Sequence, residues 1–371
     1  MILMHKDIPV AKFNTYSDKP CDALEIYNEK ELPFGLKGDL EFISKNIMSW
    51  HSNRAIPMGR INIDEIKQVL EPFGGLNKVT LNSLGLSLTD TYWYKPEKSD
   101  LTWANVSLHQ NKFDLDLFNI EFNKFVKPGI SPDYRTDGML NKFWAFDESN
   151  NFVLVKEGQP PIVAANEVVA SEIAGLLDIP HVEYLKIDFL NDKSYCICKC
   201  FAKENEDFVP ATDIGNQLEI LDGISIYNAV SALNLKSELS DMIAFDVLIH
   251  NFDRHFNNFG IILDADTSEL KRFVPLFDNG SSFGYTTDSP TDALKFPLNS
   301  RSNSVDFITN KIELPNIKML EGIIDDVYSK YNLSENQKER AKDEIRIGYD
   351  LLEERFIELE NEIDNFDIGD N

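Results

Sequence analysis

Hydrophobic and polar residues follow two periods along this chain, one typical of helices and one of strands. Apolar side chains at Leu40, Ile43, Ile47 and Trp50 recur every three or four positions, which predicts a helix. Further helices are predicted in the ranges 64–73, 166–177, 217–233, 317–331 and 334–363, the last opened by a capping box. Short apolar runs between turn residues predict strands in the ranges 8–13, 144–146, 152–156, 182–187 and 194–201.

A polar segment at residues 250–258, with the sequence His-Asn-Phe-Asp-Arg-His-Phe-Asn-Asn, interrupts this pattern. It follows a mostly apolar helix predicted over 241–249, for which Ser240 is the expected N-cap. Two short strands are predicted after it, 259–263 and 272–277, and Asp278 follows the second one. The predicted order is therefore helix, polar loop, hairpin and then an acid.

This order suits phosphoryl transfer. Asp253 and Asn258 lie five positions apart, as do the base and the metal-binding Asn of a kinase catalytic loop. Asp253 is then the candidate catalytic base, and Asn258 and Asp278 are candidate oxygen ligands of Mg²⁺ on the phosphates of ATP. Two alternatives stay open: a plain Asn/Asp-rich turn, and a metal site at His250 and His255. The metal site is the weaker one, because no further His or Cys cluster lies nearby in the sequence.

The segment before this motif is expected to contact the nucleotide. A turn at Gly138 and Asn141 leads through Lys142 into a strand, and the next strand ends at Lys156. Each of these residues also has a purely structural interpretation. A glycine is often present only because it can adopt an unusual φ angle, and a lysine at the end of a strand is usually solvated.

An acid on the helix 166–177 is expected to pair with Lys156. Glu167 and Glu172 lie about 140° apart around that helix, so only one of them can pair with Lys156. Glu167 is the favoured partner. A surface carboxylate stabilised by the helix dipole is the alternative for Glu167. The segment from Lys199 through Phe201 to Ala202 would then leave the sheet as the hinge between two lobes.

The amino-acid composition indicates which partners and which cellular compartment to expect for this protein. The 371 residues include 36 basic and 62 acidic ones, a net charge of −26, which argues against direct contact with nucleic acid or anionic membranes. No run of residues approaches a membrane span, and the first residues lack a secretory pattern. Cys196, Cys198 and Cys200 alternate on one strand face, which favours buried thiols over a metal site and predicts a reduced, cytoplasmic protein.

The ordered motifs resemble the HipA family of atypical serine/threonine kinases. The matching pieces are Gly138 with Lys142, Lys156, Asn166-Glu167, Asp253-Arg254-His255 with Asn258, and Phe277-Asp278-Asn279-Gly280-Ser281-Ser282. The resemblance implies an α+β, bilobal, protein-kinase-like fold, with a small β-rich N-lobe and a helical C-lobe after a mixed N-terminal region. It places an accessory region at 1–130, the N-lobe at 131–203 and the C-lobe at 204–371.

For function, the resemblance implies ATP- and Mg²⁺-dependent phosphorylation of protein Ser or Thr, with Asp253 as base and Lys156 as phosphate lysine. Gly138 to Lys142 would be the phosphate loop, and Ser281 and Ser282 would open the activation segment. The family often acts as a toxin held by a helix-turn-helix antitoxin. In place of the family's autophosphorylated serine this chain has Arg135, next to Thr136, which puts that switch in doubt. Two alternatives remain: a lipid or small-molecule kinase, and a pseudokinase that only binds nucleotide.

Overall fold

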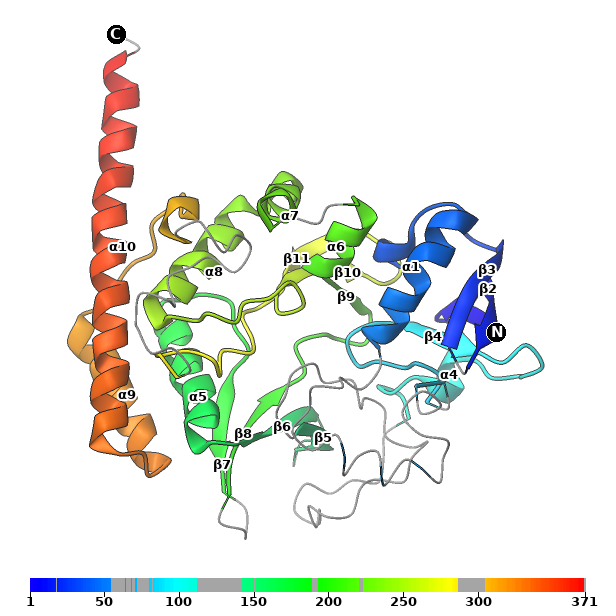
Figure 1. Cartoon of the computed structure of the whole chain (residues 1–371), viewed down its shortest axis with the longest axis horizontal. Coiled ribbons are helices and arrows are strands. Elements are labelled where there is room, and N and C mark those ends of the chain that lie inside the picture. Colours follow the sequence, from blue (N-terminus) through cyan, green and yellow to red (C-terminus); the bar gives the residue numbers. More distant parts are fainter. Residues whose placement is uncertain are drawn as a thin grey trace. The chain divides into compact units, whose positions relative to one another are not determined.

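The computed structural model describes most of the chain as an α+β structure with two compact units (Figure 1). It describes residues 1–54, 80–111, 142–188, 193–219, 223–285 and 304–369, apart from 18, 82, 148 and 150, and also the single positions 64, 68 and 71. Unit 1 comprises 1–156, 199–220 and 261–272, and unit 2 comprises 157–198, 221–260 and 273–371. The three-part division expected from the sequence stays a prediction.

Unit 1 begins with an antiparallel sheet in the order β3-β2-β1-β4. Its strands are β1 (Ile2–His5), β2 (Ile8–Tyr16), β3 (Lys19–Ile26) and β4 (Tyr92–Lys95). Helix α1 (Leu40–Ser52) starts at Asp39, whose side chain accepts a hydrogen bond of 2.9 Å from the N–H of Phe42. Ile43, Ile47 and Trp50 of α1 share one hydrophobic cluster with this sheet, so the predicted helix 40–50 and strand 8–13 are confirmed.

A second sheet of unit 1 has the order β11-β10-β9. Its strands are β9 (Glu206–Pro210), β10 (Gly260–Asp264) and β11 (Leu270–Phe273). Unit 1 also contains the short helices η1 (Phe34–Leu36), α4 (Trp103–Val106) and α6 (Ala211–Gln217). The predicted strand 259–263 is confirmed within one residue. The predicted strand 272–277 was wrong at its end, because Pro275 has no N–H to continue a ladder.

Strands β5 (Lys142–Phe146) and β6 (Phe152–Gly158) form an antiparallel pair in which Lys142 faces Lys156. Side chains directly opposite each other lie on the same face of a sheet. The same face carries Trp144, Phe146 and Phe152, which belong to one hydrophobic cluster. The two lysines therefore stand side by side at the end of an aromatic face.

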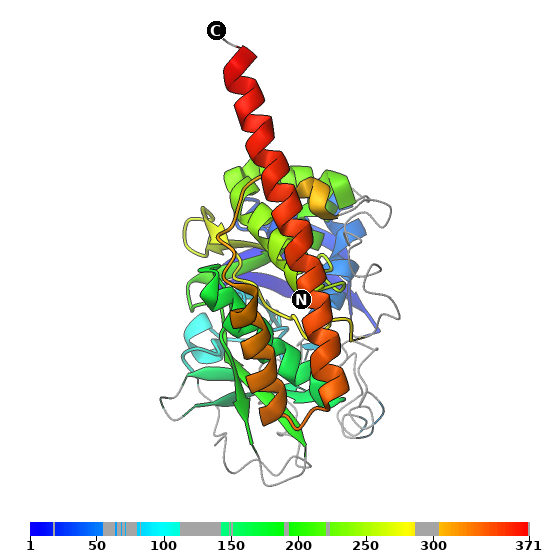
Figure 2. The same cartoon turned by 90° about the vertical axis from the view of Figure 1, so that its left-hand side faces the viewer.

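Unit 2 is mostly helical. Its elements are α5 (Pro161–Leu176), β7 (Tyr184–Ile187), β8 (Ser194–Lys199), α7 (Gly223–Val230), η3 (Ser231–Leu235), α8 (Lys236–Ile249), η5 (Ser304–Phe307), α9 (Ile317–Lys330) and α10 (Glu335–Gly369). The long helix α10 packs against α8 and α9, and α9 packs against α5 (Figures 1 and 2). A Cβ on Gly348 of α10 would lie only 2.5 Å from the carbonyl oxygen of Val247, so α8 and α10 are in backbone contact there.

Three helix predictions for unit 2 were wrong in detail. Helix α5 starts five residues before the predicted position 166, with Pro161 in its first turn, where a missing N–H costs nothing. The predicted helix 217–233 is broken between α6 and α7, and Asn234 after it is left-handed with φ 61°. Ser240 is not an N-cap, because α8 already begins at Lys236. Its buried hydroxyl accepts a 2.9 Å hydrogen bond from the N–H of Thr309.

Candidate active site

The polar loop begins where the buried helix α8 ends. His250 is the C-cap of α8 and is left-handed, with φ 51°. The N–H of Asn251 then donates to the carbonyl of Asp246 over 2.9 Å, and the N–H of Phe283 donates to the carbonyl of Ile249 over 2.8 Å. The loop 250–258 therefore leaves α8 at the same end that Phe283, in the segment 277–284, contacts.

Arg254 lies at the centre of this region and is only 1% exposed. Its Nε and Nη2 donate to the two carboxylate oxygens of Asp246 over 3.0 and 2.9 Å, a bidentate pair. Its Nη1 donates to the carbonyl oxygens of Asn258, over 3.2 Å, and Phe277, over 2.6 Å. Because one nitrogen atom binds both carbonyls, the backbone at Asn258 and the backbone just before Asp278 lie close together.

Nearby carboxylates compensate the positive charge of Arg254. Burial alone would lower the pKa of Arg254, but the carboxylates of Asp246, Asp278 and Glu167 outweigh it and raise the pKa. Removing one partner of such a buried ion pair costs about 3–5 kcal/mol, because the other charge is left without compensation. Arg254 is thus a fixed cation that fastens the loop to the segment after β11.

The loop also closes on itself. The side-chain Nδ2 of Asn258 donates to the carbonyl of Asp253 over 3.3 Å, and the N–H of Asp253 donates to Asn251 Oδ1 over 3.1 Å. Asp253 is exposed, whereas Asn258 is 2% exposed. Since the nitrogen end of the Asn258 amide bonds the loop backbone, its oxygen end is the one suited to a metal ion.

Asp278 has a left-handed backbone, with φ 59°. Such a conformation costs a residue with a Cβ about 1–3 kcal/mol and persists where neighbouring contacts impose it. The N–H of Asp278 lies 3.4 Å from the hydroxyl of Tyr184, and the next N–H, of Asn279, donates to Glu167 Oε2 over 2.8 Å. The Asn279 side-chain Oδ1 accepts from Arg254 over 2.5 Å. Both sides of Asp278 are therefore held in place.

Glu167 is 1% exposed and sits on α5, so the interpretation as a surface carboxylate was wrong. Its bond to Asn279 ties α5 to the residue after Asp278. Local sequence patterns do not predict this contact, because the two residues are 112 positions apart. The expected pair between Glu167 and Lys156 stays a prediction.

The predicted nucleotide residues of unit 1 lie on and near the β5–β6 pair. Lys156 is 3% exposed, and Lys142 faces it across the ladder, so their Cβ atoms are about 5 Å apart. Lys199 is exposed at the end of β8. The ring of Phe201 packs edge-on to Phe208 at 5.3 Å between centroids. Gly138 and Asn141 lie outside the described residues.

The side chains at the candidate metal site fit the expected Mg²⁺. Asn258 and Asp278 offer an amide oxygen and a carboxylate, the hard ligands that suit Mg²⁺ bound together with phosphates. His250 Nδ1 instead contacts Glu344 Oε2, and both residues are buried. Among the described residues no group of three or more His, Cys, Asp or Glu could hold a metal, so a soft-metal site at His250 and His255 finds no support there.

Two of the three alternating cysteines are buried, as predicted, and the third is only partly buried. Cys196 and Cys198 of β8 are buried, and Cys21 and Cys200 are partly buried; all four are free thiols.

Three residues of the network had no predicted role: Asn251, Arg254 and Asn279. An Arg directly after the candidate base, in a loop of otherwise mostly uncharged polar and aromatic residues, is the signal that points to Arg254. The two Asn residues gave no such signal, since Asn is common in turns.

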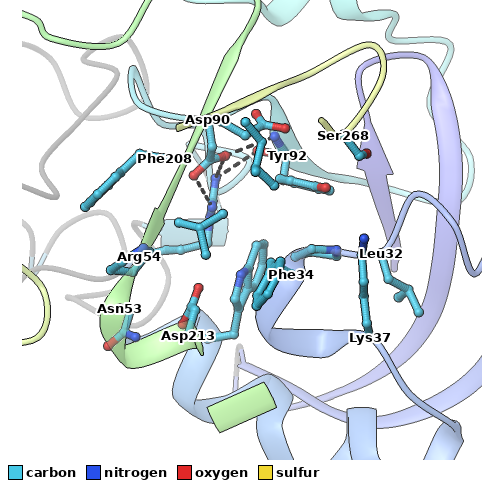
Figure 3. Close-up of a pocket in the computed structure, with 16 residues that line it drawn as sticks. Leu32, Phe34, Lys37, Asn53, Arg54, Asp90, Tyr92, Phe208, Asp213 and Ser268 are labelled. Atoms are coloured by element: carbon cyan, nitrogen blue, oxygen red, sulfur yellow. Dashed lines mark hydrogen bonds and ion pairs between the residues drawn. The ribbon is translucent and has the colours of Figure 1, made fainter. Parts of the chain in front are cut away.

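Unit 1 also contains a small pocket (Figure 3). It is lined by residues from η1, α1, β9 and α6, including Phe34, Lys37 and Asp213, and by none of the predicted site residues. At its wall Arg54 forms a buried bidentate pair with Asp90 over 2.7 and 2.9 Å and also donates to the carbonyls of Gly85 and Tyr92. These contacts give Arg54 a structural role, and we assign the pocket no part in phosphoryl transfer.

In the part of the chain that the structure describes, no helix has the length and apolarity needed to cross a bilayer.

Comparisons with known proteins give a likeness of fold. No protein-family model matches the sequence, and a search of curated protein sequences finds no relative. Among solved structures, the chain is similar to HipA in the toxin–antitoxin complex of HipA, HipB and operator DNA from Shewanella oneidensis MR-1, with a TM-score of 0.57, 12% identity and 98% of each chain covered. It is also similar to the proinflammatory kinase CtkA of Helicobacter pylori, with a TM-score of 0.48, 22% identity, and 61% of this chain and 98% of that one covered. The expected α+β, HipA-like fold is confirmed.

Proposed function

We propose that this chain, which has the fold of a HipA-like kinase, transfers the γ-phosphoryl group of ATP to a Ser or Thr hydroxyl of a protein in the presence of Mg²⁺. The observation that carries the proposal is the bonding of Arg254 to both Asn258 and Phe277. This arrangement brings the loop with Asp253 and Asn258 next to the segment with Asp278. Phosphoryl transfer needs an exposed carboxylate next to two oxygen ligands for a metal ion.

In the proposed reaction the acceptor oxygen bonds to the γ-phosphorus, and the bond from that phosphorus to the bridging oxygen of ADP breaks. Asp253 orients the hydroxyl and takes its proton, since it is the exposed acid of the loop. Asn258 and Asp278 would hold Mg²⁺, which when bound neutralises charge on the phosphates. Lys142 and Lys156, two cations on one sheet face, would bind phosphate oxygens.

The remaining predicted residues complete the proposed site. Glu167 would orient Lys156 while it holds Asn279. Gly138 and Asn141 would cover the phosphates, and Lys199 and Phe201 would lie beside the adenine at the hinge.

A single substitution tests the proposal. Asp253→Asn keeps the side-chain shape but cannot accept the proton, so we expect transfer of label from γ-³²P-ATP to protein to fall about 10²- to 10⁴-fold. Glu269→Gln, which neutralises another exposed carboxylate in the β10–β11 turn, is the matched control and should leave the rate unchanged. Equal rates for wild type and Asp253→Asn would refute Asp253 as the base.

The acceptor is tested in the same assay with a cell extract, Ser/Thr peptides, lipid head groups and small alcohols as alternatives. Labelled phosphoserine or phosphothreonine supports the proposal. Label on lipids or small alcohols alone would make the chain a kinase of another class. Nucleotide binding without any turnover would make it a pseudokinase.

We also propose an antitoxin-type protein partner with a helix-turn-helix fold, because HipA of S. oneidensis was crystallised with HipB and operator DNA. The net charge of −26 argues that this chain does not contact DNA directly. A cytoplasmic setting is part of the proposal, since the four cysteines are free thiols. Co-purification of the chain with the product of an adjacent gene would test the partner.

A further inference from the structure

A buried chain of hydrogen bonds joins helix α9 to the segment that follows Asp278. Asn166 of α5 and Tyr328 of α9 are both 0% exposed. The side-chain Nδ2 of Asn166 donates to the carbonyl oxygens of Gly280, over 3.0 Å, and Ser282, over 2.9 Å. Its Oδ1 accepts a hydrogen bond of 2.5 Å from the hydroxyl of Tyr328. Every strong bonding position of the amide nitrogen is therefore used, and the oxygen is fixed by the tyrosine.

Only an amide of this length meets these demands. A carboxylate at position 166 could accept from Tyr328 but could not donate to the two carbonyls. Burial raises the pKa of Tyr328 well above its ordinary value, so its hydroxyl stays a donor at any physiological pH. The Tyr328 hydroxyl therefore fixes the orientation of the Asn166 amide, with the amide oxygen towards the tyrosine and the amide nitrogen towards the segment 280–282.

The segment has little room to shift. A Cβ on Gly280 would lie 2.7 Å from Val163 Cγ1, so the backbone of the segment rests directly on α5. The neighbour of Asn166, Glu167, binds the N–H of Asn279. Two consecutive residues of α5 therefore bind the backbone on the far side of Asp278, whose left-handed conformation needs such support.

We propose that Asn166 and Tyr328 are positioning residues, which hold Asp278 where its carboxylate can bind the metal ion. This inference rests on the proposed function, because Asp278 is taken as a metal ligand. Neither side chain is expected to touch the metal or the nucleotide. Partners of metal ligands of this kind affect metal affinity about 10- to 100-fold.

A second buried tyrosine next to α9 provides a matched control for Tyr328. Tyr331, directly after α9, is 3% exposed, and its hydroxyl donates to the carbonyl of Tyr195 over 2.8 Å. Tyr328→Phe and Tyr331→Phe each remove one buried hydroxyl and one hydrogen bond. Only the first removes a bond that leads to the segment after Asp278.

The experiment measures Mn²⁺ affinity by electron paramagnetic resonance, in the presence of the ATP analogue AMP-PNP, and thermal unfolding without ligand. We expect Tyr328→Phe to weaken Mn²⁺ binding about 10-fold and Tyr331→Phe to change it less than about 2-fold, at similar losses of thermal stability. Asn166→Asp, which keeps the bond from Tyr328 but loses both donations, should weaken binding at least as much as Tyr328→Phe. It also serves as the second test if Tyr328→Phe does not fold.

Equal Mn²⁺ affinities for wild type, Tyr328→Phe and Asn166→Asp would overturn the inference, as would an equal loss for Tyr328→Phe and Tyr331→Phe. The readout does not depend on turnover. A wild-type protein that binds Mn²⁺ with AMP-PNP but transfers no phosphate would contradict the proposed function and leave the positioning test intact. A wild-type protein that binds no Mn²⁺ would contradict both.

Discussion

His5 is a buried residue of unit 1 whose charge depends on its immediate neighbours. It is 2% exposed; its Nδ1 lies 2.6 Å from Glu31 Oε2 and its Nε2 lies 3.2 Å from Asp207 Oδ2. Its ring stacks on Tyr92 at 4.5 Å. Burial, the largest single effect, lowers the pKa of His5, but Asp207 and Glu31 together outweigh it and raise the pKa above 6.5. The folded chain therefore holds a proton here that the unfolded chain releases near neutral pH.

This shift has a testable sign. A raised pKa in the folded state means that the stabilisation is fully present below about pH 6.5 and is lost as pH rises through the folded pKa. We expect His5→Gln to be less stable than wild type at pH 6, with a difference that shrinks towards pH 9. Urea unfolding at several pH values measures this, with His181→Gln as a control in unit 2. A constant difference between pH 6 and pH 9 would show that the proton on His5 contributes nothing.

At the scale of elements, the sequence predicted what local periodicity determines and missed what distant contacts determine. Helix α1 was predicted from the spacing of apolar residues, and the strands β5 and β6 from short apolar runs between turn residues. The loop 250–258 was predicted because polar residues end an apolar helix. The contact of Glu167 with Asn279 and the amide bonds of Asn166 could not be predicted, because each depends on how α5 packs against a segment more than 100 residues later. The role of Arg254 was also missed, because its bonds to Phe277 and Asn279 depend on how the loop meets a segment more than 20 residues later.

The packing of α5 against this segment leads to a prediction about Gly280. A Cβ there would lie 2.7 Å from Val163 Cγ1, so we expect Gly280→Ala to cost about 1–3 kcal/mol through overpacking. Val163→Ala removes the clashing methyl group, so the double variant should recover part of that loss relative to Gly280→Ala. Urea unfolding of the two single variants and the double variant measures this coupling. Additive effects in the double variant would show that the cost of Gly280→Ala has another cause.

At the scale of the whole molecule, charge is the dominant feature. With 62 acidic and 36 basic residues, the acidic side chains outnumber the basic ones by 26. Like charges repel more strongly in a compact chain than in an extended one, so the net charge of −26 destabilises the folded state. If the chain uses ATP as proposed, the same field would oppose the approach of this nucleotide, which is itself an anion. A neutralising Mg²⁺ and the paired Lys142 and Lys156 would offset that repulsion locally.

Screening of this repulsion is measurable. Raising NaCl from about 20 to 200 mM shortens the Debye length to under about 10 Å, so we expect the melting temperature to rise by a few degrees. Glu353→Lys/Glu354→Lys, at two exposed positions of α10, changes the net charge by +4, from −26 to −22, and should reduce the salt effect. Choline chloride replaces NaCl in a parallel series, which separates screening from specific binding of Na⁺. A melting temperature that falls with either salt would mean that attractive ion pairs on the surface, which salt screens, outweigh the net repulsion.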